Sequence, residues 1–264
     1  MPKQVEFSSL SLIVPAYRQE GTIQEDLSRI SKALERIRCN YEMIVIVDGK
    51  VDKTFELAKK LESPKINVFG YEKNHGKGYA IRYGIARAHG DLIAFLDAGM
   101  DINPNGISML IEHMIWYNAD IVVCSKRHPA SKVSYPLKRR LYSMVYQIFV
   151  YFLFGLKIRD TQVGLKLFKR KVLEEVLPRL LVKRYAFDIE LLAVARYIGY
   201  DRIYEAPVDL NLSFSSNIKL PSVVNMVMDT LAVFYRIKIL HYYSQKNKRR
   251  WVYDPDLDFN VNIG

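Results

Sequence analysis

The sequence predicts an α/β protein with a mainly parallel β-sheet that carries helices on both faces. Two observations predict this class. Short apolar runs alternate with amphipathic segments along the first half of the chain, and a polar cluster follows three of the runs. Because ligands of parallel sheets bind beyond the carboxyl ends of the strands, the three clusters are expected to share one crevice.

The alternation begins with residues 10–14, an apolar run that Pro15 closes and that is typical of a buried strand. Apolar residues then recur every three or four positions from Ile23 to Ile37, which predicts an amphipathic helix with Thr22 as its N-cap. Further strands are predicted at residues 43–47, 66–71, 92–96 and 121–124, and further helices at residues 54–61, 77–88 and 104–117.

The second half of the chain has a different pattern. Residues 136–155 start with a basic triplet and continue as an aromatic and aliphatic run, and residues 225–243 mix Met, Val, Leu, Phe and Tyr with basic residues. Short strands are predicted at residues 164–168 and 202–206, and helices at residues 172–181 and 187–198. The tail after Tyr243 starts basic, turns acidic and is expected to fray.

The charge balance indicates an anionic partner. Lys and Arg number 39 against 28 Asp and Glu, which gives a net charge of +11. Nucleic acid, anionic lipid and a phosphorylated substrate all fit this surplus. The basic residues are dispersed and no nucleic-acid recognition motif is present, so nucleic-acid binding is not expected.

The compartment is expected to be cytoplasmic. The N-terminus lacks the layout of a signal peptide, and Cys39 and Cys124 have neither metal-binding nor redox spacing. No stretch reaches the roughly 18 uninterrupted apolar residues of a membrane-spanning helix, because Asp229 interrupts residues 223–235. The chain is therefore not expected to span a membrane, although a position on a membrane surface stays open.

Two carboxylates, Asp97 and Asp101, follow the apolar run at residues 92–96. Carboxylates at a strand end can hold Mg²⁺ or Mn²⁺, and the cation can neutralise a diphosphate. The alternative is a polar turn in which Asp101 caps the helix near Pro104. The segment alone does not decide between them.

Two other clusters suit a nucleotide. Asp48 follows a strand, where its side chain can accept hydrogen bonds from a base or ribose. Residues 74–78, Asn-His-Gly-Lys-Gly, open a helix, and a helix N-terminus with two glycines favours anions. Because the chain has neither Walker A spacing nor a G-x-G-x-x-G pattern, ATPase and dinucleotide-binding functions lose support.

The second half adds charged groups at helix starts. Asp188 and Glu190 begin a predicted helix, where acidic residues usually complement the helix dipole. Arg139 and Ser143 are four residues apart and share a helix face, and with Arg127 this face can grip a phosphate. A solvated basic face is the equally open alternative.

In their order and spacing, these segments resemble family-2 glycosyltransferases of the GT-A fold, in particular the polyprenyl-phosphate glycosyltransferases of the dolichol-phosphate mannose synthase type. The resemblance spans roughly residues 10 to 238. It includes a P-A-Y segment from Pro15 to Glu20, the N-x-G-K-G helix start and a D-x-x-x-G-x-K loop at residues 160–166. The metal motif departs from the usual D-A-D-x-Q, since Gly99 stands at the second Asp and Asp101 at the Gln.

The resemblance implies a role for each group. The nucleotide-sugar would meet Pro15, Tyr17, Glu20, Asp48, Lys77, Asp97 and Ala98. Asp97 and Asp101 would hold Mg²⁺ or Mn²⁺. The acceptor phosphate would meet Arg127, Arg139 and Ser143, with Lys219 in place of an expected Arg. The catalytic residues would be Asp97, Asp188, Arg127 and Arg139.

The resemblance also implies a domain layout. A GT-A catalytic domain would cover residues 1–220, with a nucleotide-sugar half at 1–125 and an acceptor half at 126–220. An amphipathic helix at 221–243 would associate with the membrane, and a tail would follow at 244–264. This helix and the aromatic run at 142–154 are expected to lie in the headgroup region of the cytoplasmic face, helped by anionic lipid; core helices are the alternative.

The expected reaction is the inverting transfer of a hexose from a nucleotide-diphosphate sugar, of the GDP-mannose or UDP-glucose type, to a polyprenyl or dolichyl phosphate. Two alternatives stay open. One is a family-2 enzyme that glycosylates a saccharide or protein hydroxyl with Asp188 as base. The other is a catalytically impaired module that binds sugar nucleotides, which Gly99 and the altered nucleoside segment favour.

Overall fold

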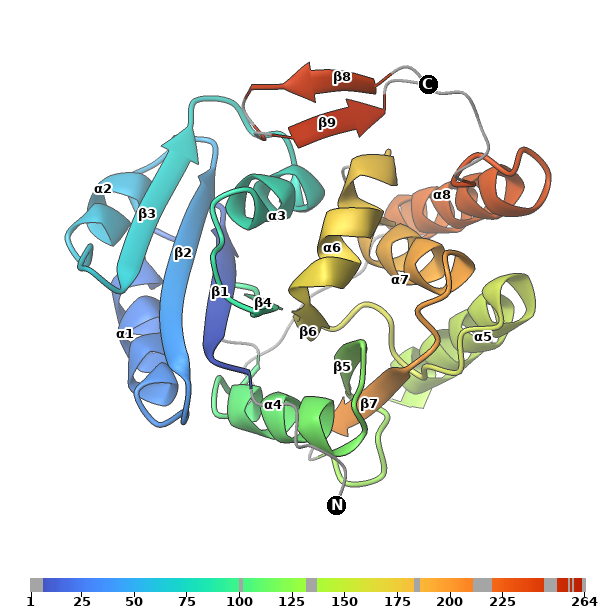
Figure 1. Ribbon diagram of the computed structural model, residues 1–264, viewed down its shortest axis with the longest axis horizontal. Coiled ribbons are helices and arrows are strands. Elements are labelled where there is room, and N and C mark those ends of the chain that lie inside the picture. The colour runs from blue at the N-terminus through green and yellow to red at the C-terminus, as the bar shows by residue number, and fades with distance from the viewer. Residues whose placement is uncertain are drawn as a thin grey trace.

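The computed structural model describes residues 7–99, 102–131, 137–182, 186–210, 220–244, 251–255, 257 and 259–262. Within this part of the chain, seven strands form one sheet in the order β3-β2-β1-β4-β6-β5-β7, with helices on both faces (Figure 1). The strands are β1 (Ser9–Ala16), β2 (Asn40–Asp48), β3 (Ile66–Tyr71), β4 (Leu92–Leu96), β5 (Ile121–Ser125), β6 (Leu165–Lys169) and β7 (Ile203–Pro207). The predicted α/β class is confirmed.

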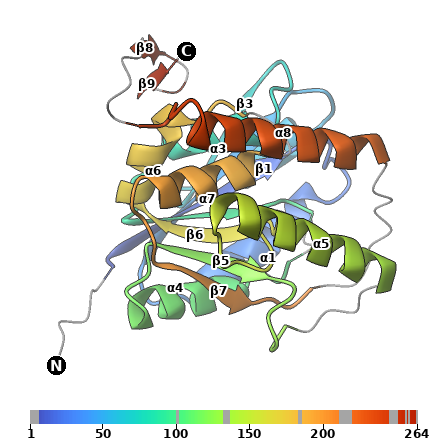
Figure 2. The ribbon, with the colours of Figure 1, turned by 90° about the vertical axis from the view of Figure 1, so that its right-hand side faces the viewer.

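The helices divide between the two faces of the sheet (Figure 2). On one face pack α1 (Ile23–Leu34), α2 (Thr54–Lys59) and α4 (Gly106–Trp116). On the other pack α3 (Lys77–Ile85), α5 (Leu137–Phe154), α6 (Arg170–Val176) with the 3₁₀ turn Leu177–Arg179, α7 (Phe187–Tyr197) and α8 (Leu220–Lys238). Alternate residues of each strand serve alternate faces: Leu12 and Val14 of β1 join the first core, and Ile13 joins the second.

The direction of β6 is the main departure from a parallel sheet. β1 pairs in parallel with β2 and β4, β2 with β3, and β5 with β7. β6 lies between β4 and β5 and is antiparallel to both. The start of β6 therefore lies at the edge where β1, β2 and β4 end.

Two local expectations differ from the structure. The hydroxyl of Thr22 donates to Gln19 Oε1 at 2.9 Å and makes no capping bond to α1, because a turn brings the amides of Thr22 and Ile23 onto the Gln19 carbonyl. The described part of the tail, expected to fray, contains the antiparallel strands β8 (Trp251–Asp254) and β9 (Phe259–Asn262).

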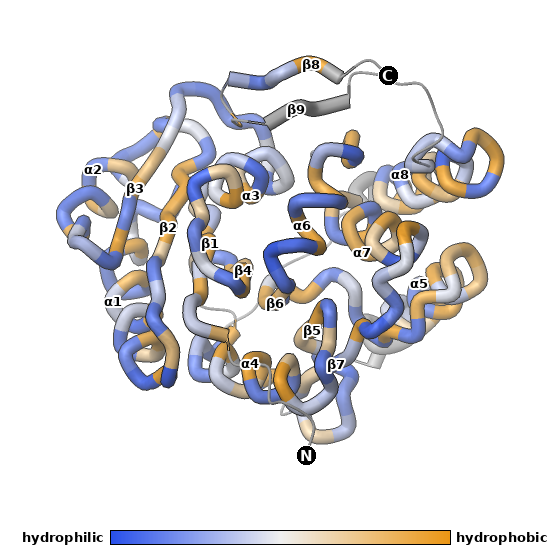
Figure 3. Tube along the Cα trace, in the orientation of Figure 1, coloured by the Kyte–Doolittle hydropathy of each residue, from blue (hydrophilic) through white to orange (hydrophobic). Residues whose placement is uncertain are grey.

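The helices α5 and α8 lie side by side on the outside of the second face (Figures 1 and 2). Tyr146 Oη and Thr230 Oγ1 are 3.0 Å apart, and the rings of Phe154 and Phe234 meet edge to face. Both helices carry hydrophobic residues interspersed with polar ones (Figure 3). Large apolar side chains are exposed on α5 (Tyr142, Met144, Val145, Ile148, Tyr151 and Phe152) and on or just after α8 (Val224, Met228, Leu231, Tyr235, Ile239 and Leu240). We call these twelve residues the α5–α8 apolar face.

No helix in the described ranges is both long enough and apolar enough to cross a membrane.

A buried carboxylate anchors α8 to α7. Glu190 of α7 is fully buried and accepts hydrogen bonds from the amides of Leu181 and Val182 and, at 3.1 Å, from Arg236 of α8. The hydroxyl of Tyr243 donates to the same carboxylate at 2.5 Å. Glu190 therefore holds together α7, the segment before it and the end of α8.

We expect Glu190→Ala to lower the free energy of unfolding by about 3–5 kcal/mol, because it leaves the Arg236 guanidinium and two amides without their partner. Urea denaturation followed by circular dichroism measures this. The control is Glu25→Ala, which removes an exposed carboxylate 3.9 Å from Arg29 and should change stability by less than about 1 kcal/mol. Equal losses in the two variants would contradict the anchoring role.

Candidate active site

A cleft of about 570 Å³ opens at the edge of the sheet where β1, β2 and β4 end. Its lining comprises Pro15, Ala16, Tyr17, Gln19, Asp48, Asn74, Gly76, Lys77, Asp97, Ala98, Gln162 and Asp188. Asp48 is the last residue of β2, Asp97 follows β4, and Asp188 lies in the first turn of α7. The strand ends therefore meet at one cleft, as predicted, and the second half of the chain contributes Gln162 and Asp188 to its lining.

The Asp48 carboxylate joins β2, β3 and the start of α3. Its Oδ1 accepts from Tyr71 Oη at 2.9 Å and from the His75 amide at 2.8 Å. Its Oδ2 accepts from Asn74 Nδ2 and from the Gly76 amide, both at 2.9 Å. Since a carboxylate has about four acceptor sites, these donors satisfy the group. Asp48 thus shapes the cleft wall rather than offering a free acceptor to a ligand.

Asp97 and Lys77 form an ion pair inside the cleft. Lys77 Nζ donates to Asp97 Oδ2 at 2.8 Å and lies 2.7 Å from Oδ1. Burial lowers the pKa of Lys77, but the negative charges of Asp97 and Asp188 outweigh burial and place this pKa above its ordinary value. Lys77 therefore stays a cation at any physiological pH.

Asp188 is neutralised by a different lysine. Lys166 Nζ, almost fully buried, donates to Asp188 Oδ1 at 2.7 Å and to the Val163 carbonyl at 2.5 Å. Burial raises the pKa of the Asp188 carboxyl, but the ammonium groups of Lys166 and Lys77 and the hydrogen bond from Lys166 hold it below its ordinary value. Asp188 is consequently a weak base.

The metal motif has an unusual backbone. Gly99 stands where the resemblance expects a second Asp. Its φ is +101°, a backbone conformation that residues other than glycine rarely adopt. Its amide donates to Asp26 Oδ2 at 3.2 Å. Asp101 lies outside the described residues. Among the described residues, no group of three or more His, Cys, Asp or Glu side chains could hold a metal ion.

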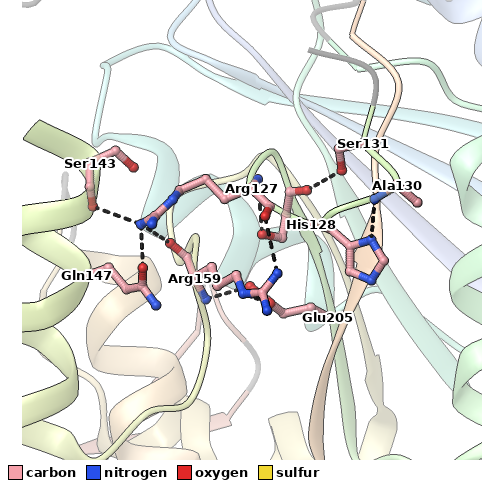
Figure 4. Close-up of polar contacts among 9 residues, drawn as sticks. Arg127, His128, Ala130, Ser131, Ser143, Gln147, Arg159 and Glu205 are labelled. Carbon is pink, nitrogen blue, oxygen red and sulfur yellow. Dashed lines mark hydrogen bonds and ion pairs between the residues drawn. The ribbon is translucent and has the colours of Figure 1, made fainter. Parts of the chain in front are cut away.

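Two of the predicted acceptor residues, Arg127 and Ser143, meet in a second cluster, shown in Figure 4. Arg127 Nη1 donates to the carbonyls of Ser143 at 3.4 Å and Arg159 at 3.5 Å, and also to Gln147 Oε1. These partners are neutral, and no ion pair of Arg127 with a described carboxylate is present. Arg159, by contrast, pairs with Glu205 at 3.8 Å. The Arg127 charge is thus balanced by no described acid.

The structure separates the predicted site residues into three groups. Pro15, Tyr17, Asp48, Lys77, Asp97, Ala98 and Asp188 line the cleft. Glu20 lies beside it and accepts from the Lys53 amide at 3.1 Å, and Arg127 and Ser143 meet each other without lining it. Asp101, Lys219 and the side chain of Arg139 lie outside the described residues. Sequence reasoning missed Ala16, Gln19, Asn74, Gly76 and Gln162 as lining residues, although each lies within a recognised motif.

The pKa of Asp188 makes stability depend on pH. In the folded state it lies below the ordinary 3.8, so the folded chain binds fewer protons than the unfolded chain in this range. Ionised Asp188 contributes stability above about pH 4, and this contribution is lost as the pH falls through the lower folded pKa.

We expect Asp188→Asn to lower the free energy of unfolding by about 3–5 kcal/mol at pH 7, because Lys166 loses its partner. The difference from the wild type should shrink as the pH falls below about 4. Urea denaturation at a series of pH values measures both effects. Asp201→Asn, which alters an exposed carboxylate 4.0 Å from Arg196, is the control. A difference that stays constant down to pH 3 would contradict the assignment.

Comparison with known proteins identifies the family to which the chain is similar. The model of the family described as "Glycosyl transferase family 2" matches residues 11–177. A human dolichyl-phosphate beta-glucosyltransferase is 35% identical over 204 residues, which are 71% of this chain and 63% of that protein. The dolichyl-phosphate beta-glucosyltransferase ALG5A of Trichomonas vaginalis is 31% identical over 242 residues, 86% of this chain and 74% of that protein. The chain therefore spans less than two thirds of the human relative.

Solved structures share the fold. The glucosyl-3-phosphoglycerate synthase of Mycobacterium tuberculosis, crystallised with Mn²⁺ and UDP-glucose, superposes with a TM-score of 0.65 at 19% identity. The match covers 97% of this chain and 86% of that one. At this identity the similarity supports the fold alone, and the expected GT-A architecture is confirmed.

Proposed function

Because the chain belongs to glycosyltransferase family 2 and is a glycosyltransferase, we propose that it transfers glucose from UDP-glucose to a dolichyl or related polyprenyl phosphate. The choice of acceptor rests on one observation, the compensated charge of the carboxylates in the cleft. Asp48, Asp97 and Asp188 each have their charge compensated by hydrogen bonds or a lysine. A hydroxyl acceptor needs a base, whereas a phosphate is already ionised near pH 7.

The relatives favour glucose as the transferred sugar. Both are named beta-glucosyltransferases, and the glucosyl-3-phosphoglycerate synthase of the same fold was crystallised with UDP-glucose. GDP-mannose, the other donor type considered from the sequence, receives no support from these relatives.

Arg127 supports a phosphate acceptor. Its guanidinium lies against the part of α5 that carries Ser143, and only neutral oxygens contact it among the described residues. A phosphate monoester would supply the missing negative charge through charge-assisted hydrogen bonds. Arg139, one turn earlier on α5, is proposed to act with it.

In the proposed reaction an acceptor phosphate oxygen attacks the anomeric carbon of glucose. The new bond joins this carbon to the lipid phosphate, the bond to the β-phosphate oxygen of UDP breaks, and UDP leaves with its electron pair. Attack from the face opposite the leaving group inverts the anomeric centre. Lys77 lies in the cleft to stabilise the departing diphosphate, and Arg127 orients the nucleophile.

One carboxylate oxygen of the cleft is suited to bind a divalent cation. Asp97 Oδ1 is buried, and the Lys77 ammonium at 2.7 Å is its partner among the described residues, so it offers a hard oxygen once Lys77 moves away. Mg²⁺ is commonly held by one or two carboxylates together with substrate phosphates. We propose that Asp97, with Asp101, holds Mg²⁺ or Mn²⁺, which when bound neutralises charge on the leaving diphosphate.

The α5–α8 apolar face supports a position on a membrane. Its twelve exposed side chains lie on two adjacent helices, and Arg127 reaches the first of these helices. A polyprenyl chain embedded in the bilayer would thus have its phosphate near Arg127. We propose that the chain is a peripheral protein of the cytoplasmic face and that this surface enters the headgroup region of anionic membranes.

We expect incubation with UDP-[¹⁴C]glucose, a short polyprenyl phosphate and Mn²⁺ to yield radioactivity that extracts into organic solvent. Asp97→Ala should lower the rate by at least about 100-fold, the order seen when an electrostatic contact to the leaving group is lost. GDP-[¹⁴C]mannose in the same assay tests the sugar.

Two results would overturn the proposal. A labelled product that stays in water would favour transfer to a saccharide or protein hydroxyl. Persistent inactivity with several donors and metals would favour a binding module without catalysis. Omission of the polyprenyl phosphate is the matched control for the first result.

We expect the full chain to float with vesicles of phosphatidylcholine and phosphatidylserine in a density gradient. The double variant Phe152→Asp/Met228→Asp should lower the bound fraction at least about tenfold, because it places charge within the apolar face. Trp116→Asp is the control, since Trp116 is 69% exposed, close to the 78% of Phe152, but lies on α4 at the other face of the sheet. Equal flotation of both variants would contradict the proposed surface.

A further inference from the structure

Lys77 covers the carboxylate that a cation would need. Its Nζ lies 2.7 Å from Asp97 Oδ1 and 2.8 Å from Oδ2, so one ammonium group contacts both oxygens. Apart from this ion pair, Oδ1 has no polar partner among the described residues and is inaccessible to solvent, although the Asp97 side chain as a whole is 40% exposed. A cation that binds Asp97 must therefore compete with the Lys77 ammonium for the same oxygens.

The surroundings of Asp97 leave it little freedom to turn away. A Cβ at position 164 would lie 2.4 Å from Asp97 Oδ2, so the backbone of Gly164 packs directly against the carboxylate. The Lys77 side chain is 33% exposed and extends from the first residue of α3. A lysine ammonium is carried on a four-carbon stem with several rotatable bonds. Of the two partners, Lys77 is thus the one that can move.

The other described carboxylates of the cleft do not offer an alternative site. Asp48 is satisfied by four donors, and Asp188 is neutralised by the buried Lys166. Position 99, where a second carboxylate would stand, is glycine. A metal ion in this part of the cleft therefore depends on Asp97 and on the release of Lys77.

We propose that Lys77 is an exchangeable partner of Asp97, and that a divalent cation and Lys77 compete for this carboxylate until a nucleotide diphosphate takes Lys77 as its own ion partner. This inference rests on the proposed donor. Because the diphosphate accepts the lysine that the metal displaces, the metal and the nucleotide bind cooperatively. The metal alone binds weakly, and each ligand raises the affinity for the other by the same factor.

The test is calorimetric titration of the full chain with MnCl₂, with and without saturating UDP. For the wild type we expect UDP to raise the Mn²⁺ affinity by about 5- to 150-fold, the usual range of coupling between two ligands. For Lys77→Met we expect Mn²⁺ alone to bind at least about fivefold more tightly than to the wild type, the scale of a partly exposed ion pair. The enhancement by UDP should shrink in the same variant.

Three variants control the comparison. Lys77→Arg keeps the cation and should retain weak binding of Mn²⁺ alone. Lys59→Met removes a lysine that pairs with Glu62 at 2.6 Å outside the cleft, and it should behave as the wild type. Asp97→Asn should abolish Mn²⁺ binding with or without the lysine. Circular dichroism melts confirm that each variant is folded.

The outcomes separate this inference from the proposed function. Mn²⁺ affinity that is unchanged or weaker in Lys77→Met, or Mn²⁺ that binds neither protein, overturns the competition. Tighter binding in Lys77→Met together with a smaller effect of UDP supports it. If UDP fails to bind at all, the donor proposal and the cooperative step fail, while the titration with Mn²⁺ alone still decides whether Lys77 and the metal compete.

Discussion

Charge balance at one edge of the sheet is the constraint on which the cleft depends. Asp48 and Asp97 meet there because parallel strands end together, and Asp188 joins them from α7. Carboxylates in such proximity are stable only when each is compensated, and the chain supplies hydrogen-bond donors for Asp48 and one lysine each for the other two. A ligand that adds negative charge to this balanced cleft must bring a cation or redirect one that is present.

The two faces of the sheet carry different kinds of helices. α1, α2 and α4 complete a buried core on one face. The other face carries α7, which presents Asp188 at its first turn, and outside it α5 and α8 with their exposed apolar residues. Glu190 connects these layers, because it lies two residues after Asp188 and bonds Arg236 of α8. The surface helix α8 is thus fixed to α7, the helix that carries a cleft residue.

Much of this arrangement follows from local sequence. Apolar runs that end in Asp48 and Asp97 predict strand ends, and parallel connections bring such ends together. What the sequence does not reveal is which partners distant residues choose. Lys166 pairs with Asp188, although no periodicity in the sequence relates their two elements. The hydroxyl of Thr22 bonds Gln19 instead of a backbone amide of α1, because a turn precedes the helix. The direction of β6 could not be predicted either, because an apolar run has the same pattern in a parallel strand as in an antiparallel one.

The reversed strand β6 has a consequence for the lining of the cleft. Since it starts where its neighbours stop, the short connection before it, with Gln162 and Gly164, arrives at the cleft from the opposite half of the chain. The cleft is thus lined by two stretches that lie far apart in the sequence, residues 15–98 and residues 162–188. A substitution in one stretch can therefore change one wall of the cleft while the other wall keeps its residues.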